Sequence, residues 1–386
     1  MKSVKKVFIF GAAGRVGLGL ATALVHRNID IAVADCIDRT LLMKKFSRII
    51  VDTRLSDGNV ISQVNVYGNV DVLDEAKVVE LLVKEKPNIV VNYAIPFTWD
   101  AARRLSNYDK ISRAGLGAFA PMQVLAPKII AQALATSEID AKFIVGNLPD
   151  ITIPIIYGLK KHFDLRLPIA GAGNVGLIEA AIKHQISIDR KISVNELSVF
   201  LVAHHIHWVA PREPGYRNDA PFLLKVTHKG NDITIELGNQ RELMNRAIVN
   251  CYEPGADFSS TTALLATKLV LFLLDDEGRR QSMHVPAPNG LPGGYPVIVK
   301  DGEINLDLPS EWKQSEAEDL MKQALQRDGI DQIAEDGSIH FNAESIAILK
   351  NEVGIILPEI VRPSELETVA KEQIRIAQNA IRSLVA

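Results

Sequence analysis

Short apolar runs alternate with longer amphipathic stretches along the first 150 residues. The runs KKVFIF, DIAVAD, NIVVNYAIPF and AKFIVGN are predicted strands, because they are short, apolar and bounded by turn residues. The stretches between them, such as LGLATALVHRN, NVDVLDEAKVVELLVKEKP and APMQVLAPKIIAQALATS, are predicted to contain helices. Strands that alternate with helices predict a doubly wound parallel sheet. NIVVNYAIPF is apolar throughout, as expected of a strand that is covered on both faces.

The second half of the chain has two long apolar segments of different character. Residues 197–210, LSVFLVAHHIHWVA, are β-branched and apolar, which predicts a strand. Because side chains alternate along a strand, His205 and His207 would share one face and His204 would point to the other. Residues 261–276, TTALLATKLVLFLLDD, are shorter than the roughly 20 apolar residues of a membrane-spanning helix, so we expect a buried helix.

Composition and charge restrict the class of partner. The chain has 386 residues, a net charge of −3 and only two cysteines. The charge gives no electrostatic reason to bind nucleic acid or an anionic membrane. The few cysteines argue against a disulfide framework, and the N-terminus does not have the pattern of a signal peptide. We therefore expect a cytoplasmic protein that acts on a small molecule.

A glycine-rich turn follows the first strand directly. In GAAGRVG, Gly11 allows the sharp turn, Gly14 allows the backbone to approach a pyrophosphate, and Gly17 allows close packing of helix and strand. Asp35 ends the second strand, where its carboxylate would accept the ribose hydroxyls and repel a 2′-phosphate, which favours NAD over NADP. The predicted cofactor-binding residues of this unit are Gly11, Gly14, Arg15, Val16, Gly17 and Asp35. In a doubly wound sheet, ligands bind at the carboxyl ends of strands, so the turn from Ala94 to Pro96 and Asn147 are also candidates.

These motifs together resemble the malate and lactate dehydrogenase superfamily. GAAGRVG is similar to the glycine motif of malate dehydrogenases, FIVGNLPDITIPIIYGL to the strand that ends in Asn-Pro-x-Asp, and FLVAHHIHWVAP to the segment with the catalytic histidine. The resemblance implies a Rossmann-type NAD-binding domain over residues 1–150 and an α+β catalytic domain over residues 151–386. Residues 310–362 have no counterpart in that superfamily and are an expected insertion, either a lid or a subunit interface.

The resemblance also implies roles for individual residues. His205 takes the place of the histidine that exchanges a proton with the substrate, and Asn147 would contact the nicotinamide ribose. The aspartate that orients this histidine maps to Asn174, and the arginine that grips the substrate carboxylate maps to Leu177. Residues 167–182 contain neither Asp nor Arg. Asn cannot compensate the charge of an imidazolium and Leu cannot bind a carboxylate, so the chain should not be an ordinary malate or lactate dehydrogenase.

Other residues are candidates to replace these missing groups. Arg113 lies where the superfamily carries a substrate-closing loop, and His207 is a candidate substrate or water contact. The remaining arginines that could contact substrate are Arg103, Arg104, Arg212 and Arg217. His205 and His207 could instead chelate a metal, but the sequence selects no third ligand, and we expect no metal.

One stretch points to another class of oxidoreductase. DVLDEAKVVELLVKEKPNIVVNYA is similar to extended short-chain dehydrogenases, in which Asp71 would contact adenine, and YGLKK supplies the Tyr157 and Lys161 of their Tyr-x-x-x-Lys catalyst. We favour the malate-type interpretation, because it already explains the placement of YGLKK.

The sequence thus predicts an NAD-dependent oxidoreductase that acts on a secondary alcohol or ketone, such as a hydroxy acid or a related polar molecule. Two alternatives remain open: an NAD-dependent sugar or sugar-acid epimerase or dehydratase without net redox, and a catalytically inactive nucleotide-binding protein. Relatives with this fold suggest a homo-oligomer, either a dimer or a tetramer.

Overall fold

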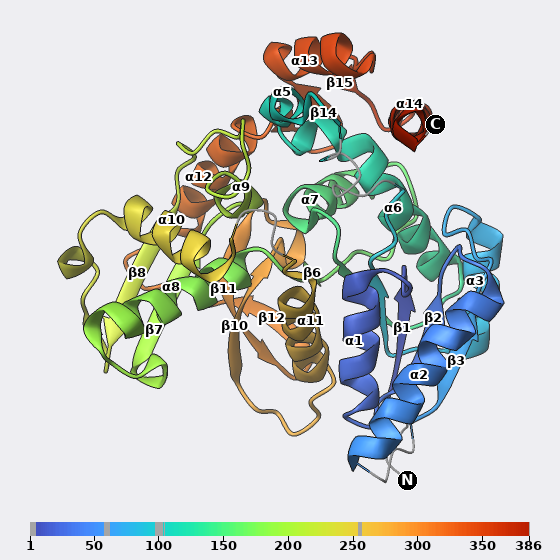
Figure 1. Cartoon of the computed structure of the whole chain (residues 1–386), viewed down its shortest axis with the longest axis horizontal. Helices are drawn as coiled ribbons and strands as arrows, with labels where there is room; N and C mark the ends of the chain where they lie inside the picture. The colour runs from blue at the N-terminus through green and yellow to red at the C-terminus, as the bar shows by residue number, and fades with distance from the viewer. Residues whose placement is uncertain (1–4, 58–61, 97–102, 104, 254–256, 386) are drawn as a thin grey trace.

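The computed structural model describes residues 5–57, 62–96, 103, 105–253 and 257–385 (Figure 1). Its largest sheet has six parallel strands in the order β3-β2-β1-β4-β5-β6. The strands are β1 (Lys6–Phe10), β2 (Asp30–Ala34), β3 (Val64–Tyr67), β4 (Ile89–Asn92), β5 (Lys142–Val145) and β6 (Ala170–Gly171). The helices along this part of the chain are α1 (Arg15–Val25), α2 (Arg39–Asp57), α3 (Glu75–Glu85), α5 (Tyr108–Ile111) and α6 (Ala120–Thr136). The predicted doubly wound sheet is confirmed.

Both faces of the sheet are buried, which explains its apolar strands. Phe8 and Phe10 of β1 belong to the hydrophobic cluster under α3 and α6. Val7 and Ile9, which alternate with them, belong to a second cluster with residues of α1 and of α11 (Ser259–Leu273). The segment predicted as a buried apolar helix is α11, and it packs against α1.

The rest of the chain forms antiparallel sheets and helices. Among the described residues these are three sheets of three strands each. The strands of the first two are β7 (Leu197–Val202), β8 (Leu223–His228), β9 (Asn231–Asp232), β10 (Gln281–Pro286), β11 (Gly294–Lys300) and β12 (Glu303–Leu306). The helices are α7 (Pro149–Leu159), α8 (Val175–Arg190), α9 (His205–Val209), α10 (Gln240–Cys251) and α14 (Leu366–Val385). The division at residue 150 stays a prediction, although β6 extends the parallel sheet to Gly171.

The expected insertion at residues 310–362 is a small α+β unit. It contains α12 (Gln314–Gln326), β13 (Ile330–Ile333), β14 (Ile339–Phe341), α13 (Ala343–Val353) and β15 (Ile360–Val361). Its strands form the third small sheet, and α13 packs against α5 and the short turn after it (Figure 1). The unit therefore lies against the chain segment that leads into α6.

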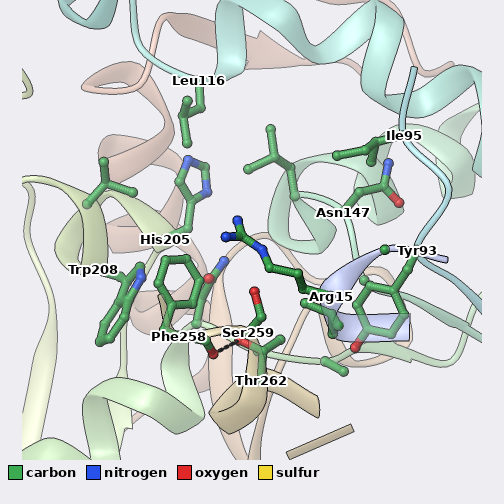
Figure 2. A pocket seen from close by; sticks show the side chains of 18 of the residues that line it. Arg15, Tyr93, Ile95, Leu116, Asn147, His205, Trp208, Phe258, Ser259 and Thr262 are labelled. Atoms are coloured by element: carbon green, nitrogen blue, oxygen red, sulfur yellow. Dashed lines mark hydrogen bonds between the residues drawn. The ribbon is translucent and has the colours of Figure 1, made fainter. Parts of the chain in front are cut away.

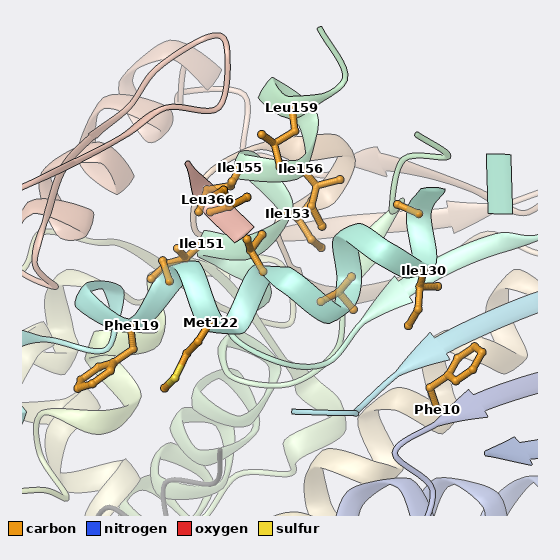
Figure 3. Packing of buried hydrophobic residues seen from close by; sticks show 14 of the residues in the cluster. Phe10, Phe119, Met122, Ile130, Ile151, Ile153, Ile155, Ile156, Leu159 and Leu366 are labelled. Atoms are coloured by element: carbon orange, nitrogen blue, oxygen red, sulfur yellow. The ribbon is translucent and has the colours of Figure 1, made fainter. Parts of the chain in front are cut away.

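Within the described residues, one helix is long and apolar enough to cross a membrane. It spans Gly117–Thr136, and 83% of its most apolar window is buried inside the protein. Figure 3 shows it beside α7, and its Met122 and Ile130 belong to the same buried cluster as Ile153 of α7. That burial is typical of a core helix.

Candidate active site

A cavity of about 520 Å³ extends from the glycine turn to α9. Gly11 and Gly14 line it at one end, and His205 lines it at the other. Figure 2 shows His205 and Asn147 on opposite sides of this space, with the side chain of Arg15 between them. The turn and the histidine that the sequence singled out therefore share one cavity.

The glycine turn has the close backbone contacts that its spacing predicted. Gly11 has a φ of +75°, and a Cβ there would lie 2.3 Å from the backbone nitrogen of Ala94. A Cβ on Gly17 would lie 2.4 Å from the carbonyl oxygen of Gly11. Gly14 is the N-cap of α1 and has no side chain with which to cap the first N–H groups of that helix. The turn is thus shaped to bring backbone and a helix N-terminus close to a ligand, and Val16 also lines the cavity.

Asp35 lies beside this turn at the end of β2. Its carboxylate oxygen Oδ2 accepts a hydrogen bond of 2.8 Å from the N–H of Ala13. Asp71, by contrast, is exposed at the approach to α3, where its Oδ1 accepts from the N–H of Leu73 at 2.9 Å. Neither carboxylate is among the cavity-lining residues described.

Only some of the residues predicted at the ends of β4 and β5 line the cavity, among those described. Asn147 lines the cavity, and its amide is held by two bonds: Nδ2 donates to the carbonyl of Gln123 at 2.7 Å, and Oδ1 accepts from Asn92 Nδ2 at 2.9 Å. In the turn after β4, the described lining is formed by Tyr93 and Ile95 rather than by Ala94 or Pro96.

The predicted strand over residues 197–210 is wrong beyond Val202. There β7 ends, and His205 begins the short helix α9. His204 is the N-cap: its Nδ1 accepts from the N–H of Ile206 at 3.4 Å, and His207 Nδ1 accepts from the N–H of His204 at 3.0 Å. Two histidine side chains therefore form a reciprocal capping box that stops the strand.

His205 is held between two buried carboxylates. Its Nδ1 lies 2.9 Å from Asp150 Oδ2, which also accepts the His205 backbone N–H at 2.7 Å. Its Nε2 lies 2.9 Å from Asp328 Oδ2, but the ring N–H makes no aligned hydrogen bond there, so this contact is an ion pair. The three residues are at most 1% exposed. The partner expected to orient His205, Asn174, lines the same cavity, but Asp150 makes that contact.

These contacts decide the charge of His205. Burial disfavours the imidazolium, but the attraction of Asp150 and Asp328 outweighs burial and raises the pKa of His205 to about 10. Burial would raise the pKa of Asp150, yet the neighbouring His205 holds it well below its usual range. Asp150 also lies in the first turn of α7, where the helix dipole favours a negative charge. At neutral pH the site therefore contains a protonated imidazole.

His204 and His207 have structural surroundings instead. Burial lowers the pKa of each to about 4, so both rings are neutral. His207 Nε2 donates to the carbonyl of Ala220 at 3.0 Å, and with Nδ1 used in the capping box both of its nitrogens bond to backbone. His207 is not among the described cavity-lining residues. The structure thus corrects its predicted place beside His205 on one strand face.

Asp150, His204 and His205 are close enough to hold a metal ion, because their ligand atoms lie within 4.8 Å of one another. The hydrogen bonds argue against that use. His204 Nδ1 accepts from Ile206 N–H, which leaves the proton of the neutral ring on Nε2, the nitrogen 3.6 Å from Asp150 Oδ2. A metal-bound nitrogen carries no proton, and the other nitrogen of such a ring normally donates. The cluster is better described as a hydrogen-bonded proton site.

The arginine candidates separate by location. Arg212 lines the cavity and is 4% exposed, with its guanidinium 4.7 Å from the Trp208 ring centroid and 4.8 Å from that of Phe258. Arg103 also lines the cavity and forms an ion pair with Glu213 at 2.6 Å. Arg113 is exposed and outside the described lining, which corrects its predicted catalytic position.

Three further positions lie away from the cavity. Arg217 is exposed and pairs with Glu344, and Lys161 pairs with Glu335 at the surface. Leu177 is fully buried in a hydrophobic cluster beneath α8. Tyr157 packs beside Gly290 and, like Lys161, is absent from the described cavity lining, which disfavours the short-chain-type catalyst. Arg104 lies outside the described residues.

The sequence motifs do not predict the two carboxylates that contact His205. Asp150 carried a signal, because it is the acid of the NLPD motif at the end of the strand that provides Asn147. Asp328 lies in the segment expected to be an insertion and follows no pattern that could have placed it beside His205.

In fold, the chain is similar to lactate and malate dehydrogenases. Malate dehydrogenase from Picrophilus torridus aligns with a TM-score of 0.57 and 18% identity, covering 84% of this chain and 97% of that one. Lactate dehydrogenase from Eimeria maxima, solved with NADH and oxamate, gives 0.55 and 14%, covering 84% and 94%. Malate dehydrogenase from Cryptosporidium parvum gives 0.53 and 15%, covering 84% and 96%.

The chain therefore has the fold of these dehydrogenases, which confirms the resemblance carried by its motifs. In sequence, it matches no family model and no curated protein.

Proposed function

We propose that this protein is an NAD-dependent oxidoreductase that acts on a secondary alcohol or ketone, with His205 as the acid and base. The observation that carries the proposal is the single cavity that joins the glycine turn to the imidazole held by Asp150. A dinucleotide site without chemistry would have no use for a buried, charged histidine at its far end.

The residues present fit a dinucleotide. Side chains at Gly11 and Gly17 would clash with backbone, so the turn is tight. Gly14 has no side chain to keep a pyrophosphate away from the turn, and the first N–H groups of α1 can bind it. Asp35 lies beside the turn, where a carboxylate accepts ribose hydroxyls, which supports NAD rather than NADP. When bound, the nicotinamide would supply or accept a hydride. The lactate dehydrogenase of the same fold was solved with NADH.

His205 would hold and transfer the proton. Asp150 fixes the orientation of the ring through Nδ1, which leaves Nε2 as the atom that faces a substrate oxygen. The N–H of Nε2 is a buried donor without an aligned acceptor, and such a donor is stabilised when a ligand oxygen accepts its hydrogen bond. Since the ring is protonated at neutral pH, the site favours proton donation during reduction of a carbonyl.

The substrate would be a polar small molecule rather than an ordinary malate or lactate. Leu177 stands in place of the carboxylate-binding arginine and is fully buried. A hydroxy acid would therefore need another cation, and Arg212 is a buried cation in the cavity wall. A cytoplasmic location and a homo-oligomeric state are further parts of this proposal.

Coenzyme binding and turnover test the proposal separately. Titration of the purified protein with NAD and with NADP should show tighter binding of NAD, and binding of neither would refute the proposal. The variant His205→Gln should bind NAD normally and lose at least about a hundredfold in carbonyl reduction, as expected when a general acid is removed. The matched control is His162→Gln, an exposed histidine outside the described cavity lining.

The same experiments also distinguish the alternative functions. If NAD stays bound through purification and no ketone or alcohol gives net oxidation or reduction, an epimerase or dehydratase replaces the dehydrogenase. If His205→Gln changes no measurable activity, the protein is a nucleotide-binding protein without this chemistry.

A further inference from the structure

The chain reverses direction at Asp328 and brings this carboxylate into the site. Asp328 follows the C-terminus of α12, where the helix dipole disfavours a negative charge. Gly329, with a φ of +96°, then turns the chain into β13. Asp328 is nonetheless fully buried, so its position has to be stabilised by groups from elsewhere in the fold.

The segment before α6 provides these groups. The N–H of Leu116 donates to Asp328 Oδ1 and the N–H of Gly117 donates to Oδ2, each at 2.9 Å. A Cβ on Gly115 would lie 2.2 Å from the backbone oxygen of Asp328, and one on Gly117 would lie 2.5 Å from it. Gly115 and Gly117 thus allow the backbone to approach Asp328 closely, and two backbone N–H groups just before α6 bind its carboxylate.

Asp328 is one of a small number of polar groups that face His205. From α7, Asp150 is charged and contacts Nδ1. From the N-cap of α9, His204 is neutral, with its ring centroid 4.2 Å from that of His205. Tyr216 is near Asp328, and burial raises the pKa of its hydroxyl well above the ordinary value, so it adds no charge. Asp328 is therefore the second charge on the imidazole and the one on its Nε2 side.

We infer that Asp328 is a positioning residue that acts through His205, keeping the imidazole protonated so that the site donates a proton over a wide pH range. The inference rests on the proposed function of His205. It gives the expected insertion at residues 310–362 a role in the chemistry: the segment supplies a charge that the malate-type motifs of the chain do not contain. The ion pair is not an aligned hydrogen bond, so Asp328 can stabilise the charge while the N–H of Nε2 remains available to a substrate oxygen.

If Asp328 had a purely structural role, its substitution would have other consequences, and Ser345 provides a matched control for them. Ser345 is in the same segment and is buried, and its hydroxyl donates to the carbonyl of Ala114 at 2.7 Å. Ser345→Ala removes a bond between the same two segments without changing a charge near His205. If Asp328 only attaches the segment, Ser345→Ala and Asp328→Asn should have similar effects.

The test is the titration of His205 by NMR in protein with ¹⁵N-labelled histidine, without coenzyme or substrate. In the wild type we expect both ring nitrogens of His205 to carry protons at pH 8. Asp328→Asn should move the midpoint of the His205 titration down by about 1 to 3 pH units, and Ser345→Ala should leave it in place. Should Asp328→Asn not fold, Asp328→Ser, which leaves room for water, is measured in the same way.

A neutral His205 ring in the wild type at pH 8 overturns the inference, and so does an Asp328→Asn shift no larger than that of Ser345→Ala. Since no coenzyme is present, these results do not depend on whether the protein is a dehydrogenase. Failure of NAD to bind would refute the proposed function and leave the coupling of Asp328 to His205 standing. If both hold, the alkaline limit of carbonyl reduction in Asp328→Asn should move down with the NMR midpoint.

Discussion

The charge of His205 should make the stability of the folded protein depend on pH in a defined window. The folded protein holds the proton of His205 up to a pKa of about 10, whereas an unfolded histidine releases it near 6.5. The stabilisation is fully present below pH 6.5 and is lost as the pH rises toward 10. Between these limits the folded state binds one more proton than the unfolded state, so the free energy of unfolding falls by about 1.4 kcal/mol per pH unit.

From pH 7 to 8.5 this effect amounts to about 2 kcal/mol. The window lies above the ordinary histidine pKa and below that of the cysteine thiols, whose pKa values burial raises further. The assay is equilibrium unfolding in urea, which does not screen charges, followed by circular dichroism at both pH values. His205→Gln removes the imidazole that titrates in this window, so the loss between the two pH values should shrink by at least half. A wild type whose stability changes by less than about 0.5 kcal/mol, or a variant with the same slope as the wild type, would refute the assigned charge.

Three other predictions concern the choice of coenzyme, the choice of substrate and the identity of the catalyst. Asp35→Ser should reduce the preference for NAD over NADP by about tenfold, or 1.4 kcal/mol, in coenzyme titrations, and an unchanged ratio would remove the ribose role of Asp35. The kcat/KM for neutral ketones should be about tenfold higher than that for 2-oxo acids of equal size, because Leu177 cannot bind a carboxylate. The reverse order in steady-state assays would show that Arg212 or another cation binds the carboxylate. Tyr157→Phe should leave turnover within about twofold of the wild type, and a loss above a hundredfold would favour the short-chain-type catalyst instead.

Local patterns were sufficient to predict the sheet and the glycine turn that lines one end of the cavity. The glycine turn is specified by residues within one strand, one turn and one helix, so its spacing alone places Gly11, Gly14 and Gly17. The same is true of Asn147, which follows the apolar strand β5 by two residues. These features depend on contacts close in sequence, and the structure has them where the spacing predicted.

The chemistry at the other end depends on contacts between distant residues. β-Branched residues before Ala203 predicted a continuing strand, but side-chain caps from His204 and His207 ended it, and histidine capping has no established sequence signature. The resemblance predicts the supporting acid within residues 167–182, whereas the acid that contacts His205 is Asp150, in the first turn of α7. Asp328 accepts a hydrogen bond from the N–H of Leu116, 212 residues earlier in the chain. The periodicity of a sequence does not predict a contact between residues so far apart.

Asp328 lies late in the chain, and its position determines when the site is completed during synthesis. The ribosome releases the glycine turn, the parallel sheet and all three histidines of α9 and its cap before residue 328 is made. A chain that stops earlier has the parts for a dinucleotide site but lacks the second charge on His205. Leu116 and Gly117 would then present two unpaired N–H groups at a helix start, which stabilises neither the cavity nor α6. Chains truncated before residue 328 should therefore be poor catalysts even where they fold.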